Sequence, residues 1–428
     1  MSGASFGNSA GKNSGDGVDR GKGPIAYISH YFPALTQTFV YREILALEDL
    51  GWEVKPFSIR RPTKGISEEA QGLAGRTTYL LPIHWGRFIA RQLRLFLSRP
   101  LRYLGLLVFV VTRPGESLRS RIHGFTHFFG GMYLVPELRK SGVRHFHAHF
   151  GMNPATLAMT ASEYLGIPFS MTIHARDLFV DTALLRTKIE KAKFVVTISD
   201  YNLRILREMA SSPAVASKIR VVHCGVDLRK FTPAEARGAA APPGTPPVFL
   251  AVGRLVPKKG YRYLVDAAHI LKARRVPCEV RVIGGGPDRE SLAARIAELE
   301  VGDRVKLEGS MPQERLLPEL RSADGFVLPC VLAEDGDQDG IPVSLMEAMA
   351  CGIPCVSTSI SGIPELIESG REGLHVPQRD PVALADALER LAVDPGLRKD
   401  LGGAGRRKVE AGFSLDVEAR EIDQLLGG

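Results

Sequence analysis

The stretch VFLAVGRLVPKKGYRYLVDAAHILKARRVPCEVRVIGGG, residues 248–286, decides the fold of this chain. Two short apolar runs, 248–253 and 279–286, lie on either side of a helical stretch. Strand, helix and strand in this order are typical of two parallel strands joined by a crossover helix. The stretch therefore predicts one unit of a parallel sheet covered by helices.

Similar apolar runs continue on both sides of this stretch, with helical segments between them. The chain has 428 residues, which is more than one core usually supports, so we expect two domains. The sequence predicts an α/β fold of two doubly wound, Rossmann-like domains that face each other across a cleft, with ligands at the carboxyl ends of the strands. The other expected strands lie at 24–32, 53–59, 77–82, 145–151, 169–175, 194–199, 219–225, 304–309, 325–329, 354–359 and 373–377.

Composition sets the expected boundaries of these domains. Residues 1–23 contain seven glycines and little that could be buried, which predicts a disordered tail. The first domain is expected at 24–230, and a stretch rich in Pro and Ala at 231–247 reads as the linker. The second domain is expected at 248–412, followed by a C-terminal helix at 413–428.

Two acids in the segment 334–365 stand eight positions apart around a predicted helix start. Asp339 falls on a tight loop, and Glu347 falls just past the first turn of the helix. Gly340 allows a close backbone approach, and Pro342 pre-sets the first turn. The amides at a helix start favour an anion. A nucleotide diphosphate sugar fits, because its hydroxyls need acceptors and its diphosphate needs donors and positive charge.

The positive charge stands upstream, at Arg254 and Lys259. Together these motifs resemble the retaining glycosyltransferases of family 4, which have the two-domain GT-B fold, and the resemblance covers about residues 24–412. It implies that Asp339 contacts the donor sugar near the reacting centre and that Glu347 accepts hydrogen bonds from the ribose hydroxyls. It also implies that Arg254 and Lys259 neutralise the diphosphate, and that Gly340 and Ile341 belong to the donor site. The family usually has Glu where Asp339 stands.

Residues 30–44, HYFPALTQTFVYREI, have Thr36, Gln37 and Thr38 where the family often has paired glycines. This variant resembles the colanic-acid-type transferases of exopolysaccharide biosynthesis. The resemblance implies transfer of a hexose from a UDP- or GDP-linked donor to a saccharide acceptor, expected to be lipid-linked, in exopolysaccharide or cell-surface glycan assembly. The transfer that this resemblance implies requires no metal and no cofactor. A nucleotide-sugar epimerase on the same fold and a catalytically silent sugar-nucleotide-binding or membrane-scaffold protein remain as alternatives.

Histidines mark a second candidate region. His174 ends a predicted strand and Asp177 follows at a helix start, which resembles the family motif whose histidine contacts the donor sugar. The simpler alternative is a buried histidine with Asp177 as a helix cap. His145, His147 and His149 alternate on one strand and therefore share a face, which could hold zinc. A strand at the edge of the core, whose last histidine reaches the cleft, is the preferred interpretation.

The acidic loop has three rival interpretations. Asp335, Asp337 and Asp339 imitate the start of a calcium loop, but its twelfth position is Met346. Asp335 and Asp337 also resemble the metal-holding acid pair of the other large glycosyltransferase fold. Glu347 could lie on a solvated helix face, although its neighbours are almost all apolar.

Basic residues are concentrated between positions 85 and 145. This segment has eleven Lys or Arg and two Glu, a net charge of +9, whereas the whole chain carries +8. Residues 85–111 interleave Arg with apolar side chains, which predicts a helix on an anionic membrane surface rather than a nucleic-acid site. A basic helix packed on its own domain is the plain alternative. Five scattered cysteines indicate a reducing compartment, so we expect a cytoplasmic protein, peripheral on the inner face of the cell membrane.

Overall fold

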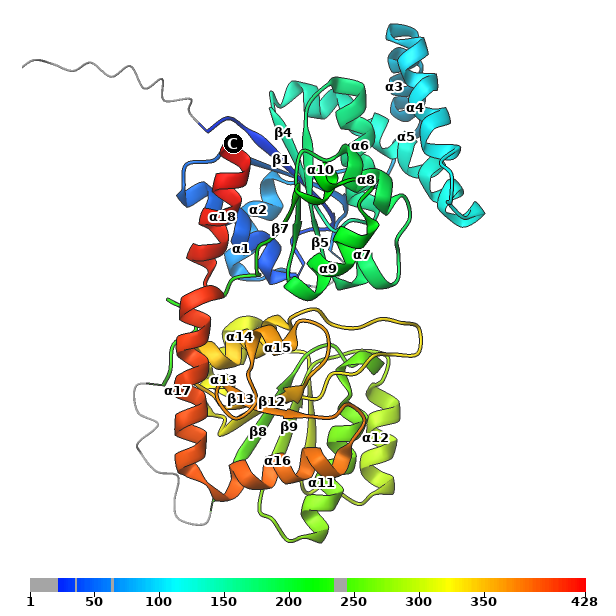
Figure 1. Cartoon of the computed structure of the whole chain (residues 1–428). Helices are drawn as coiled ribbons and strands as arrows, with labels where there is room; N and C mark the ends of the chain where they lie inside the picture. The colour runs from blue at the N-terminus through cyan, green and yellow to red at the C-terminus, as the bar shows by residue number, and fades with distance from the viewer. Residues whose placement is uncertain (1–21, 35–36, 63–64, 235–244) are drawn as a thin grey trace, which may run out of the picture.

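The structure is a computed structural model that describes residues 22–34, 37–62, 65–234 and 245–428. It contains two parallel sheets, each covered by helices, one above the other in Figure 1. This confirms the predicted fold class. Thr36, most of the predicted tail and most of the predicted linker lie outside the described residues.

The first sheet has seven parallel strands in the order β3-β2-β1-β4-β5-β6-β7. Its strands are nearly continuous apolar runs because helices bury both faces. The middle strand is β4, so the expectation that His145, His147 and His149 lie on a strand at the core edge is wrong. The strands are β1 (Ile25–Tyr31), β2 (Val54–Arg60), β3 (Thr78–Tyr79), β4 (His145–His149), β5 (Phe169–Ile173), β6 (Val195–Thr197) and β7 (Ile219–Val221).

Helices surround this sheet, and the turn between β4 and β5 shows how they connect to it. Helix α6 ends at Leu165, and Gly166 follows with a φ of 78°, a left-handed conformation that glycine adopts without a steric cost. The chain then returns directly into β5. The helices of this half are α1 (Thr38–Asp49), η1 (Glu68–Ala70), α2 (Gln71–Arg76), α3 (Trp85–Ser98), α4 (Pro100–Val111), α5 (Leu118–Lys140), α6 (Asn153–Leu165), α7 (Ala175–Phe179), α8 (Leu185–Lys191), α9 (Asp200–Met209) and α10 (Pro213–Ala216).

The second sheet has six parallel strands in the order β10-β9-β8-β11-β12-β13 and its own apolar core. Its strands are β8 (Val248–Val252), β9 (Glu279–Ile283), β10 (Val305–Gly309), β11 (Gly325–Leu328), β12 (Cys355–Thr358) and β13 (Gly373–Val376). Its helices are η2 (Pro257–Lys259), α11 (Tyr261–Ala273), α12 (Arg289–Glu298), α13 (Gln313–Ser322), α14 (Val343–Ala350), α15 (Ile363–Leu366), α16 (Pro381–Val393) and α17 (Pro395–Gly412).

The last helix, α18 (Leu415–Gly427), returns to the first sheet and packs against α1. Trp52 donates its indole N–H to Asp423 at 2.8 Å, and Gly225 donates its backbone N–H to Glu418 at 2.8 Å. In Figure 1, α17 and α18 run along one side of both sheets. The chain therefore crosses between the two halves a second time at its C-terminal end.

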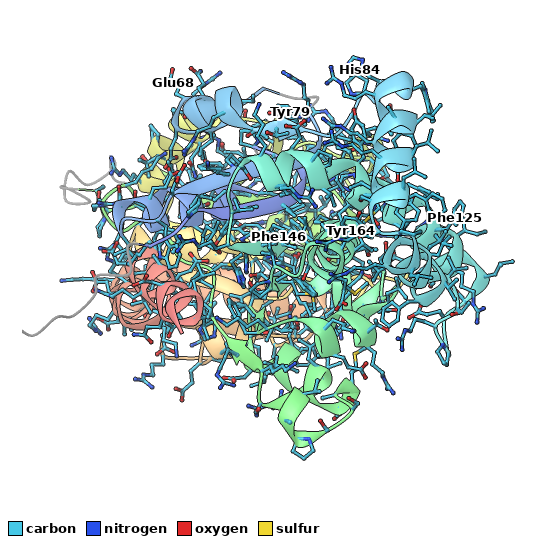
Figure 2. All side chains as sticks on the ribbon, turned by 90° about the horizontal axis from the view of Figure 1, so that it is seen from above. Glu68, Tyr79, His84, Phe125, Phe146 and Tyr164 are labelled. Carbon is cyan, nitrogen blue, oxygen red and sulfur yellow. The ribbon has the colours of Figure 1, made fainter. Side chains whose placement is uncertain are left out.

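Helices α3 and α4 and the first part of α5 project away from the rest of the molecule (Figure 1), whereas the later part of α5 packs against α6. Figure 2 shows the same feature from above: Phe125 lies at the outer edge of the projection, whereas Phe146 lies inside the sheet domain. The basic segment expected between positions 85 and 145 forms this projection and ends at β4.

Candidate active site

Asp339 lies on the loop between β11 and α14, beside two lysines that follow β8. Lys259 Nζ lies 2.7 Å from one carboxylate oxygen of Asp339, and Lys258 Nζ lies 3.3 Å from the other. Burial opposes ionisation, but Lys259 and Lys258 outweigh it and lower the pKa of Asp339 to about 2. Both lysines follow a single strand end, so the sequence around η2 positions them together.

Asp337 extends this arrangement. Its carboxylate lies 3.0 Å from Lys258 Nζ and 3.6 Å from the guanidinium of Arg176, which belongs to α7 in the first half. Asp335 accepts the backbone N–H of Asp337 at 3.0 Å. We call Lys258, Lys259, Asp337 and Asp339 the lysine–aspartate cluster. The carboxylates of Asp337 and Asp339 form ion pairs with protein cations. This arrangement does not favour binding of a metal ion, either as a calcium loop or through the pair Asp335 and Asp337.

Glu347 is the fifth residue of α14 and is only 6% exposed, so the alternative of a solvated helix face is wrong. Its Oε1 accepts hydrogen bonds from Arg42 Nη1 and Gln313 Nε2, each at 3.1 Å. Burial raises the pKa of Glu347, and the charge of Arg42 only partly offsets this effect. Arg42 comes from α1 and Gln313 from α13, so Glu347 lies where the two halves meet.

Arg42 itself is 1% exposed, and its guanidinium lies over the ring of Phe231 at 5.3 Å. Its Nε and Nη2 have no hydrogen-bond partner among the residues that the structure describes. The sequence analysis did not single out this residue. Arg42 and Glu43 are two adjacent charged residues between the apolar positions Val40 and Ile44 of the first helix. Charged residues among apolar positions are the signal that could have found them.

Arg254 is exposed at the end of β8. Next to it, the glycine loop after β9 packs directly on this strand end, because a Cβ on Gly284 would lie 1.8 Å from the carbonyl oxygen of Gly253. Leu255 donates its backbone N–H to the carbonyl of Gly285 at 3.0 Å. The two loops thus form one surface beside the lysine–aspartate cluster.

Gly340 and Ile341 lie at the boundary between the halves. A Cβ on Gly340 would lie 2.7 Å from a methyl carbon of Ile198, at the end of β6 in the first half. Ile341 is buried and lies against Gly362. The close approach expected at Gly340 is therefore made in this structure to the opposite domain.

A second acidic contact joins the halves at α15. Both carboxylate oxygens of Glu365 accept backbone N–H groups at the start of α9, from Asp200 and Tyr201, each at 2.8 Å. Although burial opposes it, His223 and these amides lower the pKa of Glu365. This carboxylate therefore stays ionised and stabilises the α9 N-terminus across the interface.

On the opposite side of the interface, His174 follows β5 and precedes α7. Its backbone N–H donates to Asp177 at 2.8 Å, so Asp177 does satisfy the start of the helix. The imidazole packs against the rings of Phe39 and Phe150, with centroids 4.9 and 4.6 Å away. Burial, then the neighbouring His149, lowers the pKa of His174 to about 3, so its ring is neutral at neutral pH.

The histidines of β4 continue this arrangement inward, and we call His145, His147, His149 and His174 the histidine cluster. His147 is bonded through both ring nitrogens, to the hydroxyls of Ser170 at 2.8 Å and Thr172 at 3.0 Å. Burial lowers the pKa of His145 and of His147 to about 3. Burial therefore keeps these two rings uncharged inside the sheet, and hydroxyl groups satisfy their nitrogens.

Glu43 completes a group that sequence reasoning missed. Ligand atoms of Glu43, His147 and His149 lie within 4.8 Å of one another, close enough to hold a metal ion. However, the ring nitrogens of His147 already bond hydroxyls, and those of His149 face Glu43 at 3.1 Å and His174 at 3.5 Å. The arrangement therefore fits a hydrogen-bond network better than the zinc site considered for this strand.

All five cysteines are among the described residues, and each is buried without forming a disulfide. Burial raises the pKa of Cys330 above its usual range, and Asp339 contributes in the same direction. These cysteines therefore behave as small apolar residues.

Comparison with known proteins agrees with this geometry. Residues 36–230 match the model "Glycosyltransferase Family 4", and residues 234–408 match "Glycosyl transferases group 1". A Salmonella typhimurium protein named as the colanic acid biosynthesis glycosyltransferase WcaL is 31% identical over 94% of this chain and 99% of its own. The amylovoran biosynthesis glycosyltransferase AmsK of Erwinia amylovora is 31% identical over 94% of this chain and 98% of its own.

The fold has solved counterparts as well. Anabaena Alr3699/HepE, in complex with UDP and glucose, superimposes with a TM-score of 0.67 at 15% identity and covers 94% of this chain and 99% of that one. Two parallel-sheet domains whose strand-end loops meet form the GT-B fold. The chain belongs to glycosyltransferase family 4 and is a hexosyltransferase related to enzymes of exopolysaccharide biosynthesis. The epimerase and the catalytically silent protein do not fit this assignment.

Proposed function

We propose that this enzyme transfers a hexose, with retained anomeric configuration, from a UDP- or GDP-linked donor to a lipid-linked saccharide during exopolysaccharide or cell-surface glycan assembly. The lysine–aspartate cluster is the observation that carries this proposal. Its two lysines lie in ion pairs beside the exposed Arg254 at the ends of β8 and β11. Cations held in this way are preorganised for a diphosphate.

The proposed transfer begins when the diphosphate takes the place of Asp339 beside Lys259. Asp339 is then released to accept hydrogen bonds from hydroxyls of the donor sugar. The bond between C1 and the phosphate oxygen breaks with its electron pair on the diphosphate, and Arg254 and Lys259 offset the growing charge. The acceptor hydroxyl bonds to C1 from the same face, and its proton passes to the departing phosphate oxygen.

Glu347 and His174 have different tasks in this proposal. Glu347, on α14 in the same half as the lysine–aspartate cluster, accepts hydrogen bonds from the ribose hydroxyls once it is released from Arg42. His174 contacts the donor sugar from the opposite half. A neutral imidazole suits a sugar hydroxyl, because it can accept or donate one hydrogen bond without attracting a second anion. The aromatic rings of Phe39 and Phe150 keep water away from that contact.

The proposed membrane contact rests on apolar side chains that project into solvent from α3, α4 and α5. Leu97 is 74% exposed and Leu101 is 87% exposed. Positions three or four residues apart share one helix face, so each helix carries an apolar ridge. The exposed members are Trp85, Ile89, Leu93, Leu97, Leu101, Leu104, Val108, Leu118, Ile122 and Phe125.

The arginines of this projection divide into two groups. Arg91 bonds Glu137 and the carbonyl of Tyr133, and Arg102 donates to the carbonyl of Glu163. Arg87 and Arg94 are exposed beside the apolar ridges. Exposed arginines next to exposed aliphatic side chains suit an anionic lipid surface, whereas a second copy of this basic segment would bring like charges together. No helix in the described part of the chain has the length and hydropathy needed to span a bilayer. The exposed apolar ridges and the exposed Arg87 and Arg94 support our proposal that the enzyme binds the inner face of the cell membrane, in the cytoplasm.

Donor binding is tested with a panel of UDP- and GDP-sugars and thermal unfolding, because a ligand that binds the native state raises its stability by mass action. One nucleotide sugar should raise the Tm of the full chain. Lys259→Ala should abolish that rise, whereas Lys399→Ala, an exposed lysine of α17, should leave it unchanged. No rise with any nucleotide sugar, or the same rise in Lys259→Ala, would contradict the proposed site.

Membrane binding is tested by sedimentation with phosphatidylglycerol vesicles. The parent protein should sediment with them, and the double variant Leu97→Gln/Leu101→Gln should remain in solution. The matched control is Val382→Gln/Val393→Gln, which removes two exposed valines from α16 in the other half and should sediment like the parent. A parent that stays in solution, or a helix variant that sediments fully, would contradict the membrane contact.

A further inference from the structure

Three buried side chains form a line from the first sheet to His174. Glu43 in α1, His149 at the end of β4 and His174 after β5 are all at least nine-tenths buried. Glu43 Oε1 lies 3.1 Å from His149 Nε2, and His149 Nδ1 lies 3.5 Å from His174 Nε2. Segments far apart in sequence thus place a carboxylate and two imidazoles in series.

The donors in this line follow from the carboxylate at its inner end. Tyr27 Oη donates to Glu43 Oε1 at 2.7 Å, and an ionised Glu43 can only accept. His149 therefore donates its Nε2–H to Glu43, which leaves its Nδ1 facing His174 Nε2 at 3.5 Å. With the hydrogen of this contact on His174 Nε2, His149 Nδ1 accepts it and the lone pair of His174 is left on Nδ1.

The ionised state of Glu43 has a physical cause. Burial favours the neutral acid, but His149, His147 and Tyr27 together outweigh it and lower the pKa of Glu43 to about 2. Glu418 on α18 is a second buried acid nearby, and burial and Glu43 raise its pKa. A neutral Glu418 beside an ionised Glu43 keeps one negative charge at the inner end of the line.

The backbone beside His149 is also unusual. Phe150 has a φ of 77°, in the left-handed region that bulky side chains avoid. Its ring lies 4.6 Å from the imidazole of His174. Strained residues of this kind concentrate at functional sites. Here the turn holds the rings of His149 and Phe150 against His174.

We propose that Glu43 and His149 are positioning residues that fix the tautomer of His174 and leave its Nδ1 as the hydrogen-bond acceptor for a hydroxyl of the donor sugar. The sugar contact rests on the function proposed above, whereas the tautomer does not. If His149 were protonated, it would donate to His174 Nε2, and His174 would carry its hydrogen on Nδ1 instead. The charge on Glu43 and the proton on His149 thus decide whether Nδ1 of His174 accepts or donates a hydrogen bond.

The tautomer is measured by nitrogen NMR on the full chain with ¹⁵N-labelled histidine, with the His174 signals assigned by their loss in His174→Gln. The parent should show an unprotonated Nδ1 and a protonated Nε2 at His174. Glu43→Gln removes the charge and keeps the shape, so it should yield a mixture of both tautomers. A parent with hydrogen on Nδ1, or a Glu43→Gln spectrum identical to the parent, would overturn the proposal.

Two substitutions of His149 separate positioning from packing. The amide of His149→Gln can still donate to Glu43 and accept from His174, so it should keep the tautomer of His174. His149→Leu can make neither hydrogen bond, so His174 should no longer be held in one tautomer. The kcat of His149→Leu should be at least ten times lower than that of His149→Gln. Equal kcat in the two folded variants would overturn the proposal. A parent with no turnover on any nucleotide sugar would instead contradict the proposed function, while the spectra still decide the tautomer.

Discussion

The lysine–aspartate cluster and the histidine cluster belong to opposite halves of the interface and are electrically unlike. The first contains four full charges, and its lysines hold the pKa of Asp339 at about 2 against the effect of burial. In the second, burial lowers the pKa of His145, His147 and His174 to about 3, so these three imidazoles are neutral at neutral pH. Burial thus neutralises groups that have no counter-ion beside them, whereas ions persist in the interior where a counter-ion lies next to them.

This contrast suggests a division of labour. A diphosphate needs cations, and the second half presents three of them, Lys258, Lys259 and Arg254. A hexose carries hydroxyls and no charge, and neutral histidines suit it. Each half of the donor would thus be recognised by a different domain, and closure of the two domains would bring the reacting centre between them.

The largest effect is expected at Lys259. Lys259→Ala should lower kcat by roughly 10²–10³-fold, as for other removed groups that stabilise developing charge. Lys258→Ala should cost less, because Lys258 lies closer to Asp337 than to Asp339. Steady-state kinetics on the donor identified by thermal unfolding measures both. Equal losses in the two variants would show that the cluster acts as general positive charge rather than through Lys259.

The next largest effect is expected at Glu347, which lies between the two clusters and accepts hydrogen bonds from both halves. Glu347→Gln should weaken donor binding by about 1.5–3 kcal/mol, the range for a hydrogen bond to a charged group, without unfolding the protein. Calorimetric titration with the nucleotide diphosphate alone is the direct measurement. Glu298→Gln, at an exposed position of α12, is the matched control. Unchanged affinity in Glu347→Gln would remove this acid from the ribose site.

The two clusters should also respond to different ranges of pH. Histidines with a folded pKa of about 3 contribute stability that is present above pH 6.5 and is lost as pH falls toward 3, because the unfolded chain takes up the protons. His147→Asn should reduce this loss by about 1.4 kcal/mol per pH unit, the value of one proton.

Asp339 has a depressed pKa, so its contribution is present above its ordinary value of 3.8 and is lost only as pH falls through about 2. Asp339→Asn should therefore leave the slope between pH 6.5 and 4 unchanged. Urea unfolding at several pH values measures both variants. A slope that changes in Asp339→Asn but not in His147→Asn would reverse the comparison.

The strand pattern of both sheets could be predicted from sequence, because parallel strands buried on two faces read as short apolar runs, as at 248–253 and 169–175. The pairing of Lys259 with Asp339 could be approached through motifs of one domain. The pairing of Glu347 with Arg42 and of His149 with Glu43 could not, because the members of each pair lie more than 100 residues apart in sequence. Only the fold brings those side chains together. Hydrophobic periodicity is read over short windows of one sequence, so it cannot indicate contacts between distant segments.

The proposal that protein cations, and not a metal ion, stabilise the leaving diphosphate during retaining transfer is tested most directly by one NMR measurement. The full chain is incubated with its α-configured nucleotide sugar and excess EDTA, and the anomeric signal of the newly released or transferred hexose is recorded before mutarotation. The account predicts an α-configured product at the rate seen without EDTA. A β-configured product, or a signal that appears only after manganese is added, would contradict it.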